Sequence, residues 1–259
     1  MPPTLEPMTL ALGTGILIGA AWPWIVAGGS VLAIPAIIAV VGLRHPRSAQ
    51  GTSIVAMSAI ALLGTVTRVR QRSIDWVGTL EFTIPALAGL ELERVLGYGL
   101  LLRVRLIVLG CLLLLTVSFM LSLPKSRDSC HSGDARARVP RIPLGFVVGI
   151  LGGWLGLGGG LLVLPSLLLS GLPLMAAAGS SFVSITSLGI ANAIPYAASN
   201  TIQWKILGTF LLGVLLGTGL SGIVVRKIGH PPTLSRMVMY GLALLSLLII
   251  GVNVHGLYT

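Results

Sequence analysis

Long apolar runs separated by short polar segments make up most of this chain. A helix needs about 20 apolar residues to cross a hydrocarbon core of roughly 30 Å. Six of the runs have about this length and predict ordinary transmembrane helices, at residues 49–67, 76–93, 104–123, 175–198, 204–225 and 236–256. The pattern therefore predicts an all-α integral membrane protein.

Two further apolar runs, residues 8–42 and 143–171, are too long for one simple span. Each has glycines near its middle, Gly28-Gly29-Ser30 in the first and Gly158-Gly159-Gly160 in the second. Each run is either a long tilted, broken helix or a re-entrant hairpin. Backbone groups freed by a break in hydrocarbon must find partners in protein, water or a ligand, which favours a binding site. The alternative is that the glycines only allow helices to pack closely.

An internal repeat organises the chain, with offsets of 128 to 131 residues. Trp24 matches Trp154 and Pro35 matches Pro165. The other matched pairs are Gly15/Gly145, Gly19/Gly149, Gly28/Gly158, Gly29/Gly159, Gly51/Gly179, Thr52/Ser180, Ser53/Ser181, Trp76/Trp204, Arg105/Arg236 and Gly110/Gly241. We therefore expect a first transmembrane repeat at 1–124, a polar linker at 125–141 and a second transmembrane repeat at 142–259.

Composition agrees with a multi-pass protein of the cell (inner or plasma) membrane. Of the 259 residues 54% are hydrophobic and 9% are charged, and the mean hydropathy is +0.97. Soluble domains contain about 25% charged residues. The net charge of +10 resides in short loops, which is typical of the positive-inside rule and not of nucleic-acid binding.

Loop charges favour re-entrant elements over full crossings. With re-entrant elements, eleven of the 17 Lys and Arg residues share the side of the 125–141 linker and six lie opposite. With full crossings the division is nine to eight and carries no orientation signal. The asymmetry places the linker in the cytoplasm. Three crossings per half is an odd number, so we expect two inverted repeats, each a Gly-broken element plus three transmembrane helices.

In an inverted arrangement, the second limbs of the two Gly-broken elements begin near the middle of the membrane. A helix N-terminus has unpaired N–H groups and a partial positive charge, so two of them form an anion site without basic side chains. Hydroxyls at the start of the next helix in each half are further candidate donors, and their alternative role is N-capping. The candidate substrate-binding residues are Gly28, Gly29, Ser30, Thr52, Ser53, Gly158, Gly159, Gly160, Ser180 and Ser181.

The second-half motif carries a resemblance. It reads Gly145-x3-Gly149-x3-Gly153-x2-Gly156-x-Gly158-Gly159-Gly160-x4-Pro165, followed by Ala177-x-Gly179-Ser180-Ser181. This string resembles the TauE/SafE (sulfite exporter) family of membrane transporters, and the first half is similar to a more divergent copy. The resemblance implies a secondary transporter or facilitator of small anions, such as sulfite or organosulfonates, that works by alternating access. Trp22-Pro23-Trp24 and Ser30 depart from the pattern, which makes the second half the better candidate for ligand contact.

The remaining polar residues carry weaker signals. Glu81 lies within a predicted span and is a candidate for proton coupling, or else it reaches headgroup water. Glu91, Glu93 and Arg94 predict an exterior interfacial cluster. Asn192 faces the pathway or bonds to a neighbouring helix.

No catalytic or metal-binding pattern appears among the His, Cys and acidic residues, so we expect neither an enzyme, a metal site nor a cofactor. The expected partners are a small anionic substrate and the lipid bilayer, and association into a homo-oligomer stays open. The alternative function is a non-transporting membrane scaffold or assembly subunit.

Overall fold

The computed structural model describes residues 5–21, 46–96, 107–108, 110–112, 114–116, 118, 140–155, 160 and 162–228. All regular secondary structure in these residues is helical, as the sequence predicts. The described helices are α1 (Leu5–Ala21), α3 (Pro46–Arg70), α4 (Trp76–Leu96), α6 (Arg141–Leu155), α7 (Val163–Leu169), α8 (Leu174–Ala198) and α9 (Trp204–Ile228).

Four of the predicted spans, 49–67, 76–93, 175–198 and 204–225, correspond to α3, α4, α8 and α9. Two of these, α3 from Gln50 to Arg70 and all of α8, are apolar enough and long enough to cross a membrane. The span 104–123 is helical at the positions described there. The span 236–256 and the first-half glycine break lie outside the described residues.

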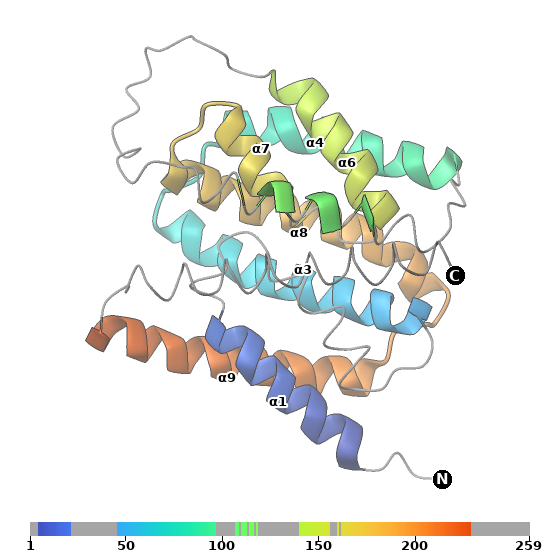
Figure 1. The fold of residues 1–259 in the computed structure, drawn as a ribbon, viewed down its shortest axis with the longest axis vertical. Coiled ribbons are helices and arrows are strands. Elements are labelled where there is room, and N and C mark those ends of the chain that lie inside the picture. Colours follow the sequence, from blue (N-terminus) through green and yellow to red (C-terminus); the bar gives the residue numbers. More distant parts are fainter. Residues whose placement is uncertain are drawn as a thin grey trace.

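Neighbouring helices contact one another in the order α1, α9, α3, α8, α4, α6 (Figure 1). The order is symmetric under the repeat, because helices equally far from its centre are repeat partners. The repeat offset relates α1 to α6, α9 to α4 and α3 to α8. The two central helices, α3 and α8, therefore pack against each other between two similar outer pairs.

Helices α4, α6 and α8 all begin at one end of the bundle. The backbone N–H of Asp75, just before α4, donates to Ser180 Oγ near the start of α8, at 3.3 Å. The guanidinium of Arg141, the first residue of α6, donates to Glu81 near the start of α4, at 2.9 Å. This end, marked by Asp75, Arg141 and Ser180, is called the linker end, because α6 follows the linker there.

Helices α1, α3 and α9 run the other way. Gly51 of α3 lies against Tyr196 near the end of α8, and Gly64 lies against Phe182 near the start of α8, so α3 and α8 are antiparallel. The N–H of Gln203, just before α9, donates to Thr52 in α3 at 3.2 Å. Helices α3 and α9 thus begin at the far end of the bundle, opposite the linker end.

Close backbone contact joins α6 to α4. A Cβ atom at Gly145 would overlap the carbonyl oxygen of Phe82, and one at Gly149 would overlap that of Ala86. Glycines four residues apart let two helices approach until their backbones touch. Residue numbers rise together along the two helices, from Gly145 against Phe82 to Gly149 against Ala86, so α4 and α6 are parallel.

The same contact recurs between α1 and α9. A Cβ atom at Gly19 would overlap the carbonyl oxygen of Val214, and one at Gly15 would lie 3.1 Å from Cα of Gly213 and close to the carbonyl oxygen of Phe210. Gly15 and Gly19 are the repeat partners of the two glycines in α6. These four glycines therefore allow close packing within the two helix pairs.

Helix α7 returns towards the linker end. Helix α6 leaves that end, the glycine-rich segment follows it, and α7 then ends at Leu169, only a short turn through Gly171 before α8 begins there. Gly171 has φ of 87°, a left-handed conformation that suits glycine. Leu164, Leu167 and Leu168 of α7 are buried in one apolar cluster with Phe82 of α4.

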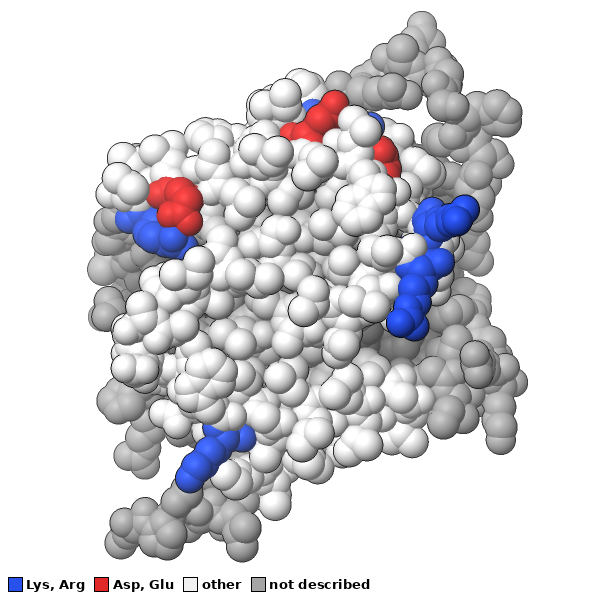
Figure 2. Space-filling view, turned by 180° about the vertical axis from the view of Figure 1, so that it is seen from behind, with Lys and Arg blue, Asp and Glu red and all other residues white. Residues whose placement is uncertain are grey.

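Charged side chains lie towards the two ends of the bundle. Figure 2 shows them around the margin of one face, with an uncharged area in the middle. Many large apolar side chains on the outside of the helices are more than half exposed, among them Leu17, Val77, Ile84, Met175 and Leu212. Extensive exposed apolar surface is unfavourable in water and marks contact with another apolar phase.

Candidate functional site

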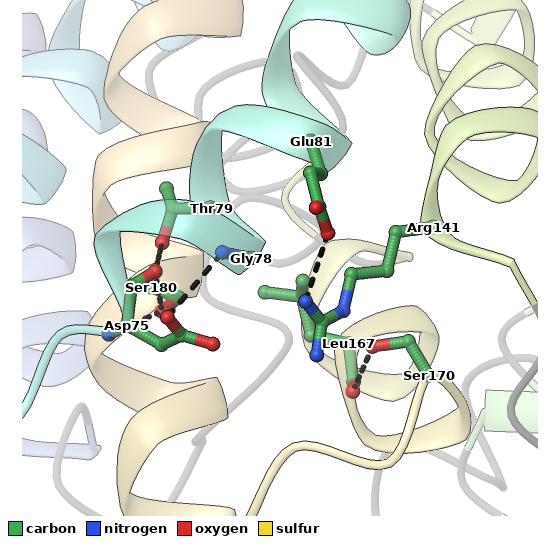
Figure 3. A network of polar contacts seen from close by, with 8 residues as sticks. All are labelled: Asp75, Gly78, Thr79, Glu81, Arg141, Leu167, Ser170 and Ser180. Carbon is green, nitrogen blue, oxygen red and sulfur yellow. Dashed lines mark hydrogen bonds and ion pairs between the residues drawn. The ribbon is translucent and has the colours of Figure 1, made fainter.

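Two reciprocal hydrogen bonds join the halves of the chain. Thr52 Oγ1 accepts from the backbone N–H of Gln203, and Ser180 Oγ accepts from the backbone N–H of Asp75. The two pairs are equivalent, since an offset of 128 residues converts Thr52 into Ser180 and Asp75 into Gln203. Each hydroxyl therefore holds the residue that precedes a helix of the opposite half. Figure 3 shows the Ser180 contact.

These hydroxyls do not cap their own helices. Helix α8 begins at Leu174 and its N-cap is Pro173, so Ser180 and Ser181 lie inside it. Ser181 Oγ donates to the carbonyl of Ala178 at 2.9 Å. Thr52, inside α3, likewise donates to a carbonyl four residues earlier, at 2.7 Å. The capping role is therefore wrong, because α8 begins six residues before Ser180 and α3 begins six residues before Thr52.

The predicted hydroxyls do not converge on one point. Thr52 and Ser53 are buried at the far end and Ser180 and Ser181 are buried at the linker end. Helices α3 and α8 are antiparallel, so positions related by the repeat lie at opposite ends of the pair. Of the other predicted residues, Gly160 is buried in a turn, and Gly28, Gly29, Ser30, Gly158 and Gly159 lie outside the described residues.

Further hydroxyls, three of them buried and that of Thr65 half-buried, lie between α3, α4 and α8. Thr83 and Ser184 are 2.7 Å apart across α4 and α8, and Thr65 and Thr186 are 3.3 Å apart across α3 and α8. Sequence analysis did not identify this group. Its signal is a four-residue spacing, because Ser184 follows Ser180 by one helical turn on the same face.

Glu81 forms an ion pair that links the two halves. Its Oε2 accepts from Nη1 of Arg141 at 2.9 Å, and both side chains are partly exposed (Figure 3). Lys205, the second residue of α9, lies at the far end instead. The predicted linker thus ends at a residue that belongs to α6 and contacts α4.

The exterior cluster predicted around Glu91 contains an ion pair. Nη1 of Arg94 lies 2.6 Å from Oε1 of Glu91, and Nη2 of Arg94 donates to the carbonyl of Ala191 in α8 at 3.0 Å. Arg94 therefore ties the end of α4 to α8. A Cβ atom at Gly153 of α6 would lie 3.0 Å from Oε2 of Glu93, so these side chains surround the same end of α4.

Two buried N–H donors have no hydrogen-bond partner in the described part of the chain. They are Nδ2 of Asn192 in α8 and Nε1 of Trp154 in α6. Sequence analysis left two roles open for Asn192, and its amide nitrogen makes neither a described bond to a neighbouring helix nor contact with solvent. Within the described residues there is also no cluster of three His, Cys, Asp or Glu side chains able to hold a metal. The arrangement offers donors for a small polar solute.

Comparison with protein families decides the classification. The family model of the sulfite exporter TauE/SafE matches residues 10–249, which is nearly the whole chain. The chain belongs to the sulfite exporter TauE/SafE family. This is a family of membrane transporters, and the apolar helices and exposed apolar surface fit that setting.

Curated relatives match the chain along most of their length. A "Probable membrane transporter protein" of Xylella fastidiosa strain Temecula1 is 28% identical over 250 residues, which is 95% of both chains. The "Probable membrane transporter protein YunE" of Bacillus subtilis strain 168 is 25% identical over 238 residues, covering 82% of this chain and 86% of its own. No solved structure matches the chain.

Proposed function

We propose that the protein is a secondary transporter or facilitator of small anions, built from two inverted repeats that alternate access across the cell membrane. The observation that carries this proposal is the equivalence of contacts made by the two halves. The Thr52–Gln203 bond and the Ser180–Asp75 bond join repeat-equivalent residues, and one bond lies at each end of the bundle.

Helix directions support the inverted arrangement. Helices α1, α3 and α9 run from the far end, while their repeat partners α6, α8 and α4 run from the linker end. The tight glycine contact between α1 and α9 has its counterpart between α6 and α4. Each pair joins one helix from each half, so the halves interlock. Inverted repeats of this kind allow two states related by exchanging the conformations of the halves.

The path of α6 and α7 supports a re-entrant element. Helix α6 has 15 residues, about 22 Å of helix, which is too short to cross a core of roughly 30 Å. Helix α7 then turns back towards the linker end, where α8 begins. With re-entrant elements in both halves the linker is cytoplasmic, and Arg68, Arg70, Arg72 and Arg141 share its side, as the positive-inside rule requires.

The distribution of polar groups supports an anion as substrate. The acidic side chains that the structure describes lie towards the ends of α4. Buried polar groups elsewhere are hydroxyls and N–H donors. We propose that Gly28, Gly29, Ser30 and Gly158 to Gly160 contribute backbone N–H groups to the anion, while Thr52, Ser53, Ser180 and Ser181 line the two ends of its path. The family description makes sulfite and related sulfur oxoanions the first candidates.

A binding and transport panel tests the function. The apparent melting temperature of the purified protein is measured with sulfite, sulfate, thiosulfate, sulfoacetate, taurine, acetate and chloride, followed by uptake into proteoliposomes. We expect a selective rise of about 5–11 °C with one sulfur oxoanion at 100 times its Kd, since a ligand bound to the folded state stabilises it by mass action, and saturable uptake of the same anion. A flat panel without uptake would support the scaffold alternative.

Among the carboxylates that the structure describes, we propose Glu81 as the group that couples transport to protons. We expect Glu81→Gln to change the free energy of unfolding by less than about 1 kcal/mol, because the Arg141 pair is partly exposed. It should also remove the dependence of uptake on an imposed pH gradient. Glu91→Gln is the matched control, since Glu91 pairs with Arg94 on its own helix. A variant that keeps gradient-driven uptake would exclude Glu81 from coupling.

A further inference from the structure

The unpaired donors of Trp154 and Asn192 lie at the same level of the bundle. Gly153, immediately before Trp154, is against Leu90 and Glu93 of α4. The carbonyl of Ala191, immediately before Asn192, bonds to Arg94 of α4. Both donors are therefore next to residues that contact the last two turns of α4, one on α6 and one on α8.

Both donors also lie beside one apolar cluster of the second half. Trp154 is in the last turn of α6 and directly precedes Leu155, which is buried in that cluster. Asn192 follows Leu188 by one helical turn, on the same face of α8. Leu188 is buried in the same apolar cluster as Leu155. The two donors thus lie next to this cluster, one on α6 and one on α8.

Leaving such groups unpaired is costly. Asn192 is only 7% exposed, and a buried donor without a partner loses its bond to water without replacement. A residue without a polar side chain at this position would avoid the cost, and the first half of the chain has such a residue. The position equivalent to Asn192 in the first half is Gly64, where the ring of Phe182 fills the space. An amide retained in the second half alone indicates a ligand.

We propose that the indole N–H of Trp154 and the amide of Asn192 are side-chain donors for the transported oxoanion, at a single asymmetric site in the second half. The inference rests on the proposed function. Helix α7 has seven residues, so its N-terminal dipole is a weak anchor without such donors. Both groups offer N–H, and an indole is a donor only, which fits an acceptor-rich oxoanion and not a cation.

Two near-isosteric substitutions test the site. Trp154→Phe removes the indole N–H and keeps an aromatic ring, and Asn192→Leu replaces the amide with an apolar group of similar size. For each we expect about 10- to 100-fold weaker binding of sulfite, or of whichever panel anion the wild type binds, from the loss of one hydrogen bond to a charged ligand. Without anion, the melting temperature of Asn192→Leu should be equal to or above that of the wild type, because a buried unpaired amide has been removed.

The matched control is Trp204→Phe, which makes the same change at an exposed tryptophan that begins α9. Wild-type affinity in Trp154→Phe or Asn192→Leu would overturn the assignment of that donor. Failure of Asn192→Leu to fold would also overturn it, since the amide would then serve the fold. If the wild type neither binds nor transports any of the anions, the proposed function itself fails. If the wild type and the variants bind an anion equally well, only the assignment of the two donors fails.

Discussion

Replacing Gly149 with valine should disrupt the packing of α6 on α4. A Cβ atom there would overlap the carbonyl oxygen of Ala86 and lie 2.7 Å from its carbonyl carbon, both of which are backbone atoms that no rotamer change can move. The helices would have to separate along a contact that also includes Gly145. We expect a loss of about 3 kcal/mol in the free energy of unfolding, at the upper end of the range for overpacking.

The measurement is thermal unfolding in detergent, where this loss corresponds to a fall of roughly 6–12 °C in the apparent melting temperature. Gly19→Val in α1 should have a similar effect, since Gly19 meets Val214 in the equivalent contact. Gly13→Ala is the control. No atom lies within 4 Å of a Cβ at Gly13, so alanine should stabilise the helix by about 0.5–1 kcal/mol. Equal melting temperatures for Gly149→Val and the wild type would contradict the close contact.

Covalent closure of either end should stop transport. Cysteine pairs at Asp75 and Ser180, or at Thr52 and Gln203, lie where hydrogen bonds join the halves at the linker end and at the far end. Alternating access requires the halves to separate at each end in turn. We therefore expect oxidation of either pair to lower the initial rate of uptake at least about 10-fold, because closing one end removes one of the two states that transport needs.

The background for this experiment replaces Cys111 and Cys130 with serine, so that the introduced pair is the sole source of thiols. Reduction of the disulfide should restore uptake, which separates the effect of the crosslink from that of the substitutions. Asp75→Cys alone serves as a control, since Asp75 Oδ1 accepts from the N–H of Gly78 at the start of α4 and its loss costs about 1 kcal/mol. Full uptake by a quantitatively crosslinked protein would rule out rocking at that end.

Local sequence determined the helices and the relation between the halves. The spans of α3, α4, α8 and α9 follow from the lengths of their apolar runs, which the thickness of a bilayer sets without reference to other helices. The repeat was visible because matched residues such as Trp76 and Trp204 keep a constant offset. Gly145 and Gly149 likewise match Gly15 and Gly19 at a constant offset of 130.

Tertiary structure alone decided which surfaces meet. Nothing local to Gly149 specifies Ala86 as its neighbour, because a small residue permits close approach by any helix of complementary shape. The same holds for Ser180, whose hydroxyl bonds to the opposite half and not to its own helix start. Antiparallel packing of α3 on α8 then places repeat-related hydroxyls at opposite ends, and packing of α6 and α8 around the end of α4 buries Trp154 and Asn192 with unpaired N–H groups. The local sequence determines which side chains each helix presents. Which helices pack together depends on shape complementarity over whole helix faces.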